Sequence, residues 1–190
     1  MALPKMLILG HSFIRRLDNF VTANPNLDHN FSLGNIAKFK WHGVGGRTVA
    51  KTVKYDLPVI AAFAPDIVIL QLGTNDLSHL DPLVAGSSIE ELVTTLHHEY
   101  NVRIVGVCQT LRGSDPVFNA RVHALNKYLK TLLEPLPYSF FWGHRGFWNS
   151  SQDFLARDGV HLNRQGHFKF FRSLRGAVLR SLRSCSATAT

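Results

Sequence analysis

The chain has 190 residues, of which 45% are hydrophobic and 18% are charged, close to the average of globular proteins. This composition excludes a disordered chain, and the length suits one domain with its own core. With 21 Lys and Arg against 13 Asp and Glu, the formal net charge is +8, which favours contact with an anionic partner such as nucleic acid or a membrane surface.

Five apolar runs alternate with helix-like segments along the chain. The predicted strands are 6–9, 37–44, 67–72, 102–108 and 138–142, and the predicted helices are 13–21, 48–62, 88–100, 116–133 and 165–182. The third and fourth runs, IVILQL and VRIVGVC, are almost continuously apolar, which is typical of strands buried on both faces of a parallel sheet. The alternation predicts an α/β fold, a three-layer α/β/α sandwich of flavodoxin-like type with about five parallel strands. We expect one domain over residues 1–183 and a flexible tail over 184–190.

Cysteine usage and the start of the chain bear on location. Cys108 lies in an apolar run and Cys185 near the end of the chain, so they are poor disulfide partners and give no metal-binding spacing. We therefore expect no metal, and a reducing compartment. No signal peptide is recognised, and no stretch approaches the roughly 20 apolar residues of a membrane-spanning helix. These features predict a soluble, cytoplasmic protein.

A serine follows the first predicted strand, in the sequence Gly10-His11-Ser12-Phe13. Ligands of open parallel sheets bind beyond the carboxyl ends of the strands, so a serine at this corner can turn its hydroxyl toward a ligand. Its backbone N–H belongs to the first helical turn and is free to hold a developing oxyanion. The alternative is an ordinary N-cap serine.

Glycines and an asparagine follow the second and third predicted strands. The loop 42–48, HGVGGRT, permits close backbone approach to a ligand, but it lacks the residues of a Walker phosphate loop. A simple glycine-rich turn is the alternative. Asn75, in the sequence GTND, can donate its side-chain amide to an oxyanion, or alternatively form an Asx turn or helix cap.

Asp158 and His161 lie three residues apart on a loop beyond the fifth predicted strand. At this spacing a carboxylate can hold one imidazole nitrogen while the other nitrogen faces a serine. The alternative is a pair of ordinary surface residues. Because the carboxyl ends of parallel strands share one edge of the sheet, we expect all four segments to meet at one crevice.

The four segments resemble the sequence blocks of the SGNH hydrolase superfamily, also called GDSL-like esterases and lipases. LILGHSFIRRL resembles block I, HGVGGRT block II, LQLGTND block III and RDGVHLNRQGH block V. The resemblance implies Ser12 as nucleophile, His161 as base and Asp158 as its orienter. It also implies an oxyanion hole of the Ser12 N–H, the Gly46 N–H and the Asn75 amide, without metal or cofactor. The implied activity is hydrolysis of short acyl (acetyl) esters or lipid esters through an acyl-enzyme.

His11 departs from block I, in which an Asp usually precedes the serine. We expect this change to alter loop support or substrate approach and to leave the triad intact, since adjacent side chains rarely point at one hydroxyl. GHSFIRRL in a basic chain also resembles the esterase domain of first-open-reading-frame proteins of vertebrate LINE retrotransposons. That resemblance implies a domain of a longer protein with coiled-coil and RNA-binding parts.

The last predicted helix separates charged from apolar residues. Steps of about 100° per residue place five basic residues on one face and five apolar residues on the other. The basic residues are Lys169, Arg172, Arg175, Arg180 and Arg183, and the apolar residues are Phe170, Phe171, Leu174, Val178 and Leu182. The basic face is either solvated surface or a contact for RNA or anionic lipid head groups. The rival functions are therefore a catalytically silent module that binds RNA or anionic membrane, and a phosphate-binding flavodoxin-like protein.

Overall fold

The computed structural model describes residues 2–148 and 152–187, and its centre is a five-stranded parallel sheet. In spatial order the strands are β2 (Lys38–Gly43), β1 (Lys5–Gly10), β3 (Ile67–Gln71), β4 (Ile104–Cys108) and β5 (Ser139–Trp142). Every neighbouring pair runs parallel. This order is that of the flavodoxin-like fold, and the predicted α/β class and the predicted strands are confirmed.

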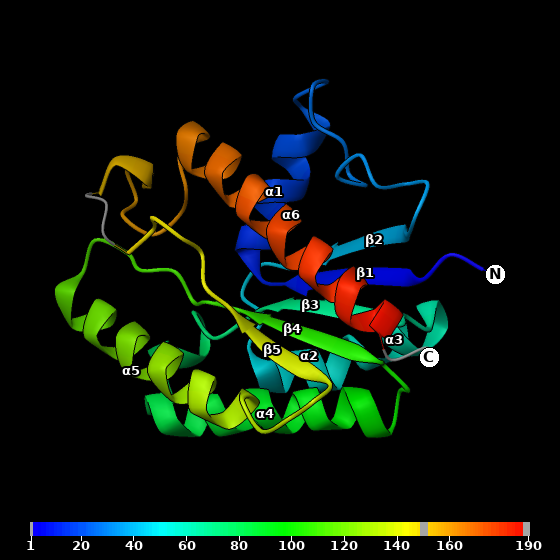
Figure 1. The fold of residues 1–190 in the computed structure, drawn as a ribbon. Helices are drawn as coiled ribbons and strands as arrows, with labels where there is room; N and C mark the ends of the chain where they lie inside the picture. The colour runs from blue at the N-terminus through cyan, green and yellow to red at the C-terminus, as the bar shows by residue number, and fades with distance from the viewer. Residues whose placement is uncertain (1, 149–151, 188–190) are drawn as a thin grey trace.

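Helices cover both faces of the sheet (Figure 1). One face carries α1 (Ser12–Thr22) and α6 (Arg164–Ala187). The other carries α2 (Val49–Tyr55), α3 (Leu57–Phe63), α4 (Pro82–His98) and α5 (Pro116–Leu133). The short 3₁₀ helices η1 (Asp76–Ser78) and η2 (Gln152–Phe154) lie in the connections that follow β3 and β5. The three-layer sandwich is thus confirmed.

Each face of the sheet has its own apolar core because successive strand residues point to opposite faces. Ile8 and Ile69 pack with Phe170 in the core beneath α1 and α6. Leu7 and Val68 pack in the core shared with α4 and α5. All residues of β3 and β4 are buried, as their apolar runs predicted.

Two helical bounds on the α4 face differ from the prediction. α4 begins at Pro82, and the side chain of Asp81 caps it by accepting a hydrogen bond of 2.8 Å from the Leu83 N–H. The predicted start at residue 88 was wrong because a proline at the first helical position is itself a start signal. The predicted helix 48–62 is divided at Asp56, since Pro58 has no N–H with which to continue α2.

The last helix is longer than predicted. α6 continues to Ala187, so residues 184–187, expected in a flexible tail, are helical. Cys185 is buried in the core, and its carbonyl accepts a hydrogen bond from the Arg103 guanidinium at 2.8 Å, which explains the extension. The rest of the predicted tail, residues 188–190, lies outside the described residues. Within the described chain, no helix has both the length and the apolar character needed to cross a membrane.

Candidate active site

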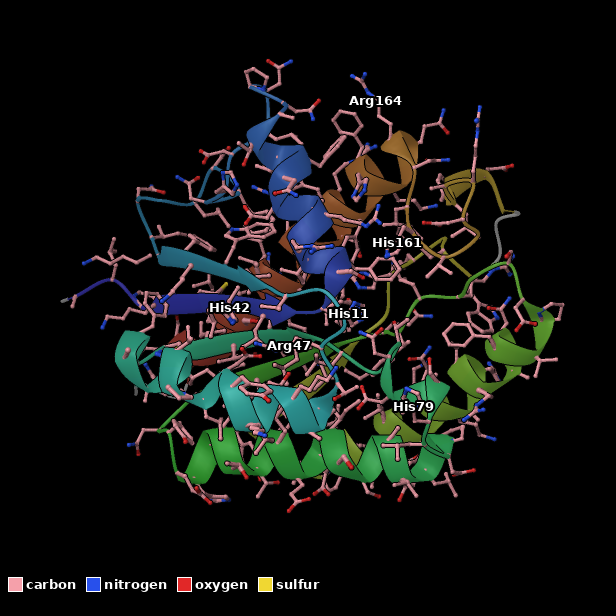
Figure 2. The ribbon with its side chains drawn as sticks, turned by 180° about the vertical axis from the view of Figure 1, so that it is seen from behind. His11, His42, Arg47, His79, His161 and Arg164 are labelled. Atoms are coloured by element: carbon pink, nitrogen blue, oxygen red, sulfur yellow. The ribbon has the colours of Figure 1, made fainter. Side chains whose placement is uncertain are left out.

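Ser12 is the first residue of α1, and the N-cap His11 alone separates it from the end of β1 at Gly10. Gly10 makes this corner possible, because an added Cβ would lie 2.5 Å from the Gln71 carbonyl oxygen and 2.8 Å from the Ile14 side chain. A side chain at position 10 would therefore collide with β3 and α1, and glycine avoids both collisions. The Ser12 Oγ lies 3.1 Å from His161 Nε2, and Figure 2 shows His161 beside the first turn of α1.

Asp158 holds His161 from the other side. Its Oδ2 accepts a hydrogen bond of 2.8 Å from His161 Nδ1, and its Oδ1 accepts from the backbone N–H groups of His161 and Val160 at 2.9 and 3.0 Å. These bonds, first the one from the His161 backbone, hold the pKa of Asp158 well below its usual range. The carboxylate is therefore charged at neutral pH. Gly159 allows the loop to fold back, since its φ is +68°.

Asn163 anchors this loop at its far end. Its side-chain amide donates to the carbonyls of Asp153 and Leu155 at 2.6 and 3.2 Å. Its side-chain oxygen accepts from the Gly166 N–H at 2.9 Å, in the first turn of α6. The loop that carries Asp158 and His161 is thereby tied to a helix packed on the core.

The glycine loop, residues 42–48, lies against the corner between β1 and α1 that carries Ser12. The Val44 N–H donates to the Gly10 carbonyl at 3.0 Å, two residues before Ser12. Gly46 has a φ of +70°, and an added Cβ would meet nothing within 4 Å, so glycine serves the backbone conformation here and not a close approach. The loop therefore presents its backbone next to the serine corner.

Asn75 joins the glycine loop to the segment after β3. Its side-chain amide donates to the Arg47 carbonyl at 2.7 Å, which leaves the second amide hydrogen for another acceptor. Next to it, Asp76 Oδ1 accepts from the Val49 N–H at 2.9 Å. Burial raises the pKa of Asp76.

Gly46 and Asn75 also line one cavity of about 540 Å³.

The five predicted site residues thus form two groups at one sheet edge. Ser12, His161 and Asp158 form a continuous line of hydrogen bonds. Gly46 and Asn75 lie together in the neighbouring cavity wall. The first group can pass a proton from a serine hydroxyl to an imidazole, and the second presents N–H groups of the kind that hold an oxyanion.

His11 caps α1 and does not contact the serine hydroxyl. It is fully buried, and its Nδ1 accepts from the Phe13 N–H at 3.4 Å. Burial, with a smaller effect from His161, lowers the pKa of His11 to about 3, so its ring is neutral. In the part of the chain that the structure describes, its Nε2 has no hydrogen-bond partner. His11 therefore supports the first turn of α1 and lies beside the site.

The basic face of α6 contacts neutral groups of the protein. Lys169 Nζ donates to the Gly146 carbonyl at 2.8 Å and lies 4.0 Å from the Phe154 ring centroid. Arg180 lies 4.3 Å from the Phe140 ring centroid. Neither Lys169 nor Arg180 forms an ion pair with an Asp or Glu among the described residues. Across residues 2–148 and 152–187, no cluster of three or more His, Cys, Asp and Glu is placed to hold a metal ion.

Three residues that hold the site loops were missed by the sequence analysis. Asn163 and Asp76 lie inside the quoted segments RDGVHLNRQGH and LQLGTND, and their place in these segments was the available signal. Asp56 lies within the predicted helix 48–62 and had no local signal. Its carboxylate contacts both His42 and Arg47, at 2.9 Å each.

The fold resembles those of several esterases. A carbohydrate esterase of family 3 from Talaromyces cellulolyticus has a TM-score of 0.75 at 18% identity, with 95% of this chain and 99% of that chain covered. A variant of an acetyl-xylooligosaccharide esterase from Geobacillus Stearmophilus has a TM-score of 0.70 at 16% identity, with 94% of each chain covered. An acetyl esterase mutant solved with acetate ion has a TM-score of 0.73 at 17% identity, with 95% and 99% covered.

At these identities the likeness shows the fold alone. No curated protein matches this sequence. The model of the GDSL-like lipase/acylhydrolase family matches residues 9–168, and the chain therefore belongs to this family.

Proposed function

We propose that the protein is a serine esterase that hydrolyses short-chain acyl esters, above all acetyl esters, or lipid esters. The observation that carries the proposal is the line of hydrogen bonds from Ser12 through His161 to Asp158, with distances of 3.1 and 2.8 Å. Membership of the acylhydrolase family supports the reaction class.

The reaction proceeds in two acyl-transfer steps. His161 Nε2 takes the proton of Ser12 Oγ as this oxygen attacks the ester carbonyl carbon, and the carbonyl electron pair moves onto its oxygen. The Ser12 and Gly46 N–H groups and the Asn75 amide hold this oxyanion. When the intermediate collapses, the C–O bond to the alcohol breaks and the alcohol leaves with the proton from His161. Water then attacks the acyl-enzyme, with His161 again as base, and releases the acid.

Asp158 supports the imidazole through both steps. Its carboxylate accepts the Nδ1–H, which fixes the tautomer that presents Nε2 to the serine. It also stabilises the imidazolium that forms when His161 takes the serine proton. Its lowered pKa keeps the carboxylate charged at neutral pH.

The structural neighbours favour a short acyl group over a long one. They include an acetyl esterase and an acetyl-xylooligosaccharide esterase. We therefore place acetyl esters ahead of long-chain lipid esters as substrates.

Hydrolysis of p-nitrophenyl acetate tests the proposal. We expect the native protein to release p-nitrophenol and the Ser12→Ala variant to lose this activity. Ser173→Ala is a matched control, because Ser173 also contacts a histidine, His144, at 2.7 Å but lies outside the site. Equal rates for the native protein and Ser12→Ala would overturn the esterase proposal. A series from acetate to octanoate esters should show falling kcat/KM with chain length.

A second candidate function, contact with RNA or an anionic membrane, is favoured by a cavity between β5 and α6. This cavity has a volume of about 1010 Å³, and its lining includes Arg145, Lys169, Arg172, Arg180, Trp142 and Trp148. None of these four cations forms an ion pair with an Asp or Glu in the described residues. Basic and aromatic side chains together suit phosphate-bearing partners.

Charge reversal tests this second function. The double variant Arg172→Glu/Arg180→Glu should bind a labelled single-stranded RNA, or vesicles containing anionic lipid, more weakly than the native protein. Native binding should also weaken with added salt. If the native protein binds neither probe at low salt, the second function is wrong.

A further inference from the structure

One buried carboxylate connects the two ends of the glycine loop. Asp56 is 1% exposed. Its Oδ2 accepts from Arg47 Nε at 2.9 Å, and its Oδ1 accepts from Arg47 Nη2 and His42 Nε2 at 2.9 Å each. His42 immediately precedes the Gly-Val-Gly-Gly segment 43–46, and Arg47 immediately follows it. Figure 2 shows the two side chains on the same side of the sheet.

The glycine loop needs such a connection to hold a fixed shape. Three of the four residues 43–46 are glycine, which has more accessible backbone conformations than any other residue. A free loop of this kind would present the Gly46 N–H in many directions. A two-point contact between a guanidinium and a carboxylate fixes both distance and orientation, and burial strengthens it.

The contact between Asp56 and Arg47 also bears on Asn75, the second proposed oxyanion donor. The Arg47 carbonyl accepts the Asn75 amide hydrogen at 2.7 Å, so the position of Arg47 sets the plane in which the second Asn75 hydrogen lies. Gly46 is the residue directly before Arg47. The directions of both donors therefore depend on where Asp56 holds Arg47.

We propose that Asp56 is a positioning residue that aligns the Gly46 and Asn75 donors with the oxyanion through Arg47 and His42. The inference rests on the proposed esterase function. Donors that are fixed before the reaction stabilise the transition state because they need not reorient as charge develops. Loss of the contact should lower kcat, since the charge forms only in the transition state, and should leave KM nearly unchanged.

Asp56→Asn is the direct test, measured as kcat and KM for p-nitrophenyl acetate. An asparagine side chain has one acceptor oxygen, and its NH₂ group would face N–H donors of Arg47 or His42. We expect kcat to fall by about 10- to 100-fold, less than the loss of a donor itself, with KM within about twofold of native. Arg47→Lys keeps the charge but loses the two-point contact, and should fall between native and Asp56→Asn.

A double-mutant cycle separates positioning from general loss of structure. In an Asn75→Ala background, Asp56→Asn should lower kcat by a smaller factor than in the native background, because one of the donors that it aligns is already absent. A purely structural effect would give the same factor in both backgrounds and would overturn the inference. Asp18→Asn is the matched control, because it breaks an aspartate–histidine contact of 2.8 Å between Asp18 and His29, outside the site.

The outcomes distinguish this inference from the function on which it depends. Thermal unfolding of each variant shows whether it folds, and if Asp56→Asn does not, Arg47→Lys and His42→Gln take its place. Ser12-dependent hydrolysis with native kcat in these variants would overturn the positioning role alone. Absence of Ser12-dependent hydrolysis in the native protein would overturn the esterase function and, with it, the positioning role.

Discussion

Two of the aspartates that contact a histidine do so at nearly the same distance but in opposite surroundings. Asp158 lies 2.8 Å from His161, and its side chain is 46% exposed. Asp56 lies 2.9 Å from His42, and its side chain is 2% exposed. The exposed pair belongs to one short loop, whereas the buried pair joins the end of β2 to the junction of α2 and α3.

The difference between the pairs lies in their further partners. His161 turns its second nitrogen to the Ser12 hydroxyl, so a proton can pass along that line. Asp56 instead accepts hydrogen bonds from two nitrogens of the Arg47 guanidinium. The positive charge of the guanidinium balances the negative charge of the carboxylate, and the two bonds fix the position of the Asp56 side chain. The geometry of an aspartate–histidine contact therefore does not assign a role by itself. The third group in contact with each pair, Ser12 for the exposed pair and Arg47 for the buried pair, distinguishes a role in proton transfer from a role in structural support.

Removing the charge of the exposed pair should have the largest effect. In Asp158→Asn the amide can hold the wrong His161 tautomer, so Nε2 no longer accepts the serine proton. We expect kcat for p-nitrophenyl acetate to fall on the order of 10³- to 10⁴-fold, with little change in thermal stability because Asp158 is exposed. A decrease of less than tenfold would show that His161 acts without this carboxylate.

Removing Asn75, the proposed oxyanion donor that contacts Arg47 next to the buried pair, should have the next largest effect. Asn75→Ala deletes the amide that contacts the Arg47 carbonyl and that we propose as a donor to the oxyanion. We expect kcat to fall about 10²- to 10³-fold, with KM nearly unchanged. Asn75→Asp should show a similar loss, because it keeps the size but not the N–H donor. Native kcat in both variants would exclude Asn75 from the oxyanion hole.

Acidification should separate buried from exposed histidines. Burial lowers the pKa of His11 and of His144 to about 3. Between pH 6.5 and 3 the unfolded chain binds protons at these sites and the folded chain does not, so stability falls as pH falls. The two groups together lose about 7 kcal/mol between pH 6.5 and pH 4, at 1.36 kcal/mol per unit for each. We therefore expect the Tm to drop by roughly 15–25 °C between pH 7 and pH 4, since 1 kcal/mol corresponds to about 2–4 °C at this size.

His144→Gln provides the comparison for this pH dependence. It removes one of the two groups while the amide can still contact Ser173 or Gln71, the native partners of the imidazole. The Tm of this variant should therefore depend less steeply on pH than that of the native protein. Equal pH dependence in the two proteins would contradict the assignment of a neutral, buried His144.

The smallest effect is expected at Gly46. An alanine there meets no atom within 4 Å but must adopt a φ of +70°. The cost is about 1 kcal/mol, or a Tm lower by about 2–4 °C, with kcat within tenfold of native because the backbone N–H remains. Gly143→Ala is the control, since Gly143 has no positive φ and its added Cβ would lie 3.8 Å from the nearest atom. A larger loss of stability would mean that the loop has less space than the structure shows.

The exposed pair could be predicted from sequence, but the buried pair could not. Ser12, Asp158 and His161 carry the signal of their residue types, and their segments follow strands whose apolar runs are plain. Asp56 lies in a segment that is helical on both sides, where a lone carboxylate indicates a solvent-facing position. Its burial depends on β2 and the glycine loop folding over it, which no local pattern records. The end of α6 beyond residue 182 was also not predicted, because it depends on the burial of Cys185 in the core, which no local pattern records.

Labelling with a fluorophosphonate tests the central claim most directly. Such a reagent phosphonylates a serine hydroxyl only when a neighbouring base takes its proton, and fluoride leaves as the P–O bond forms. Mass spectrometry of the native protein should place a single adduct on the peptide that contains Ser12. The His161→Ala variant should show none under the same conditions. A native protein that stays unlabelled, or one labelled equally with and without His161, would contradict a Ser12–His161 nucleophile.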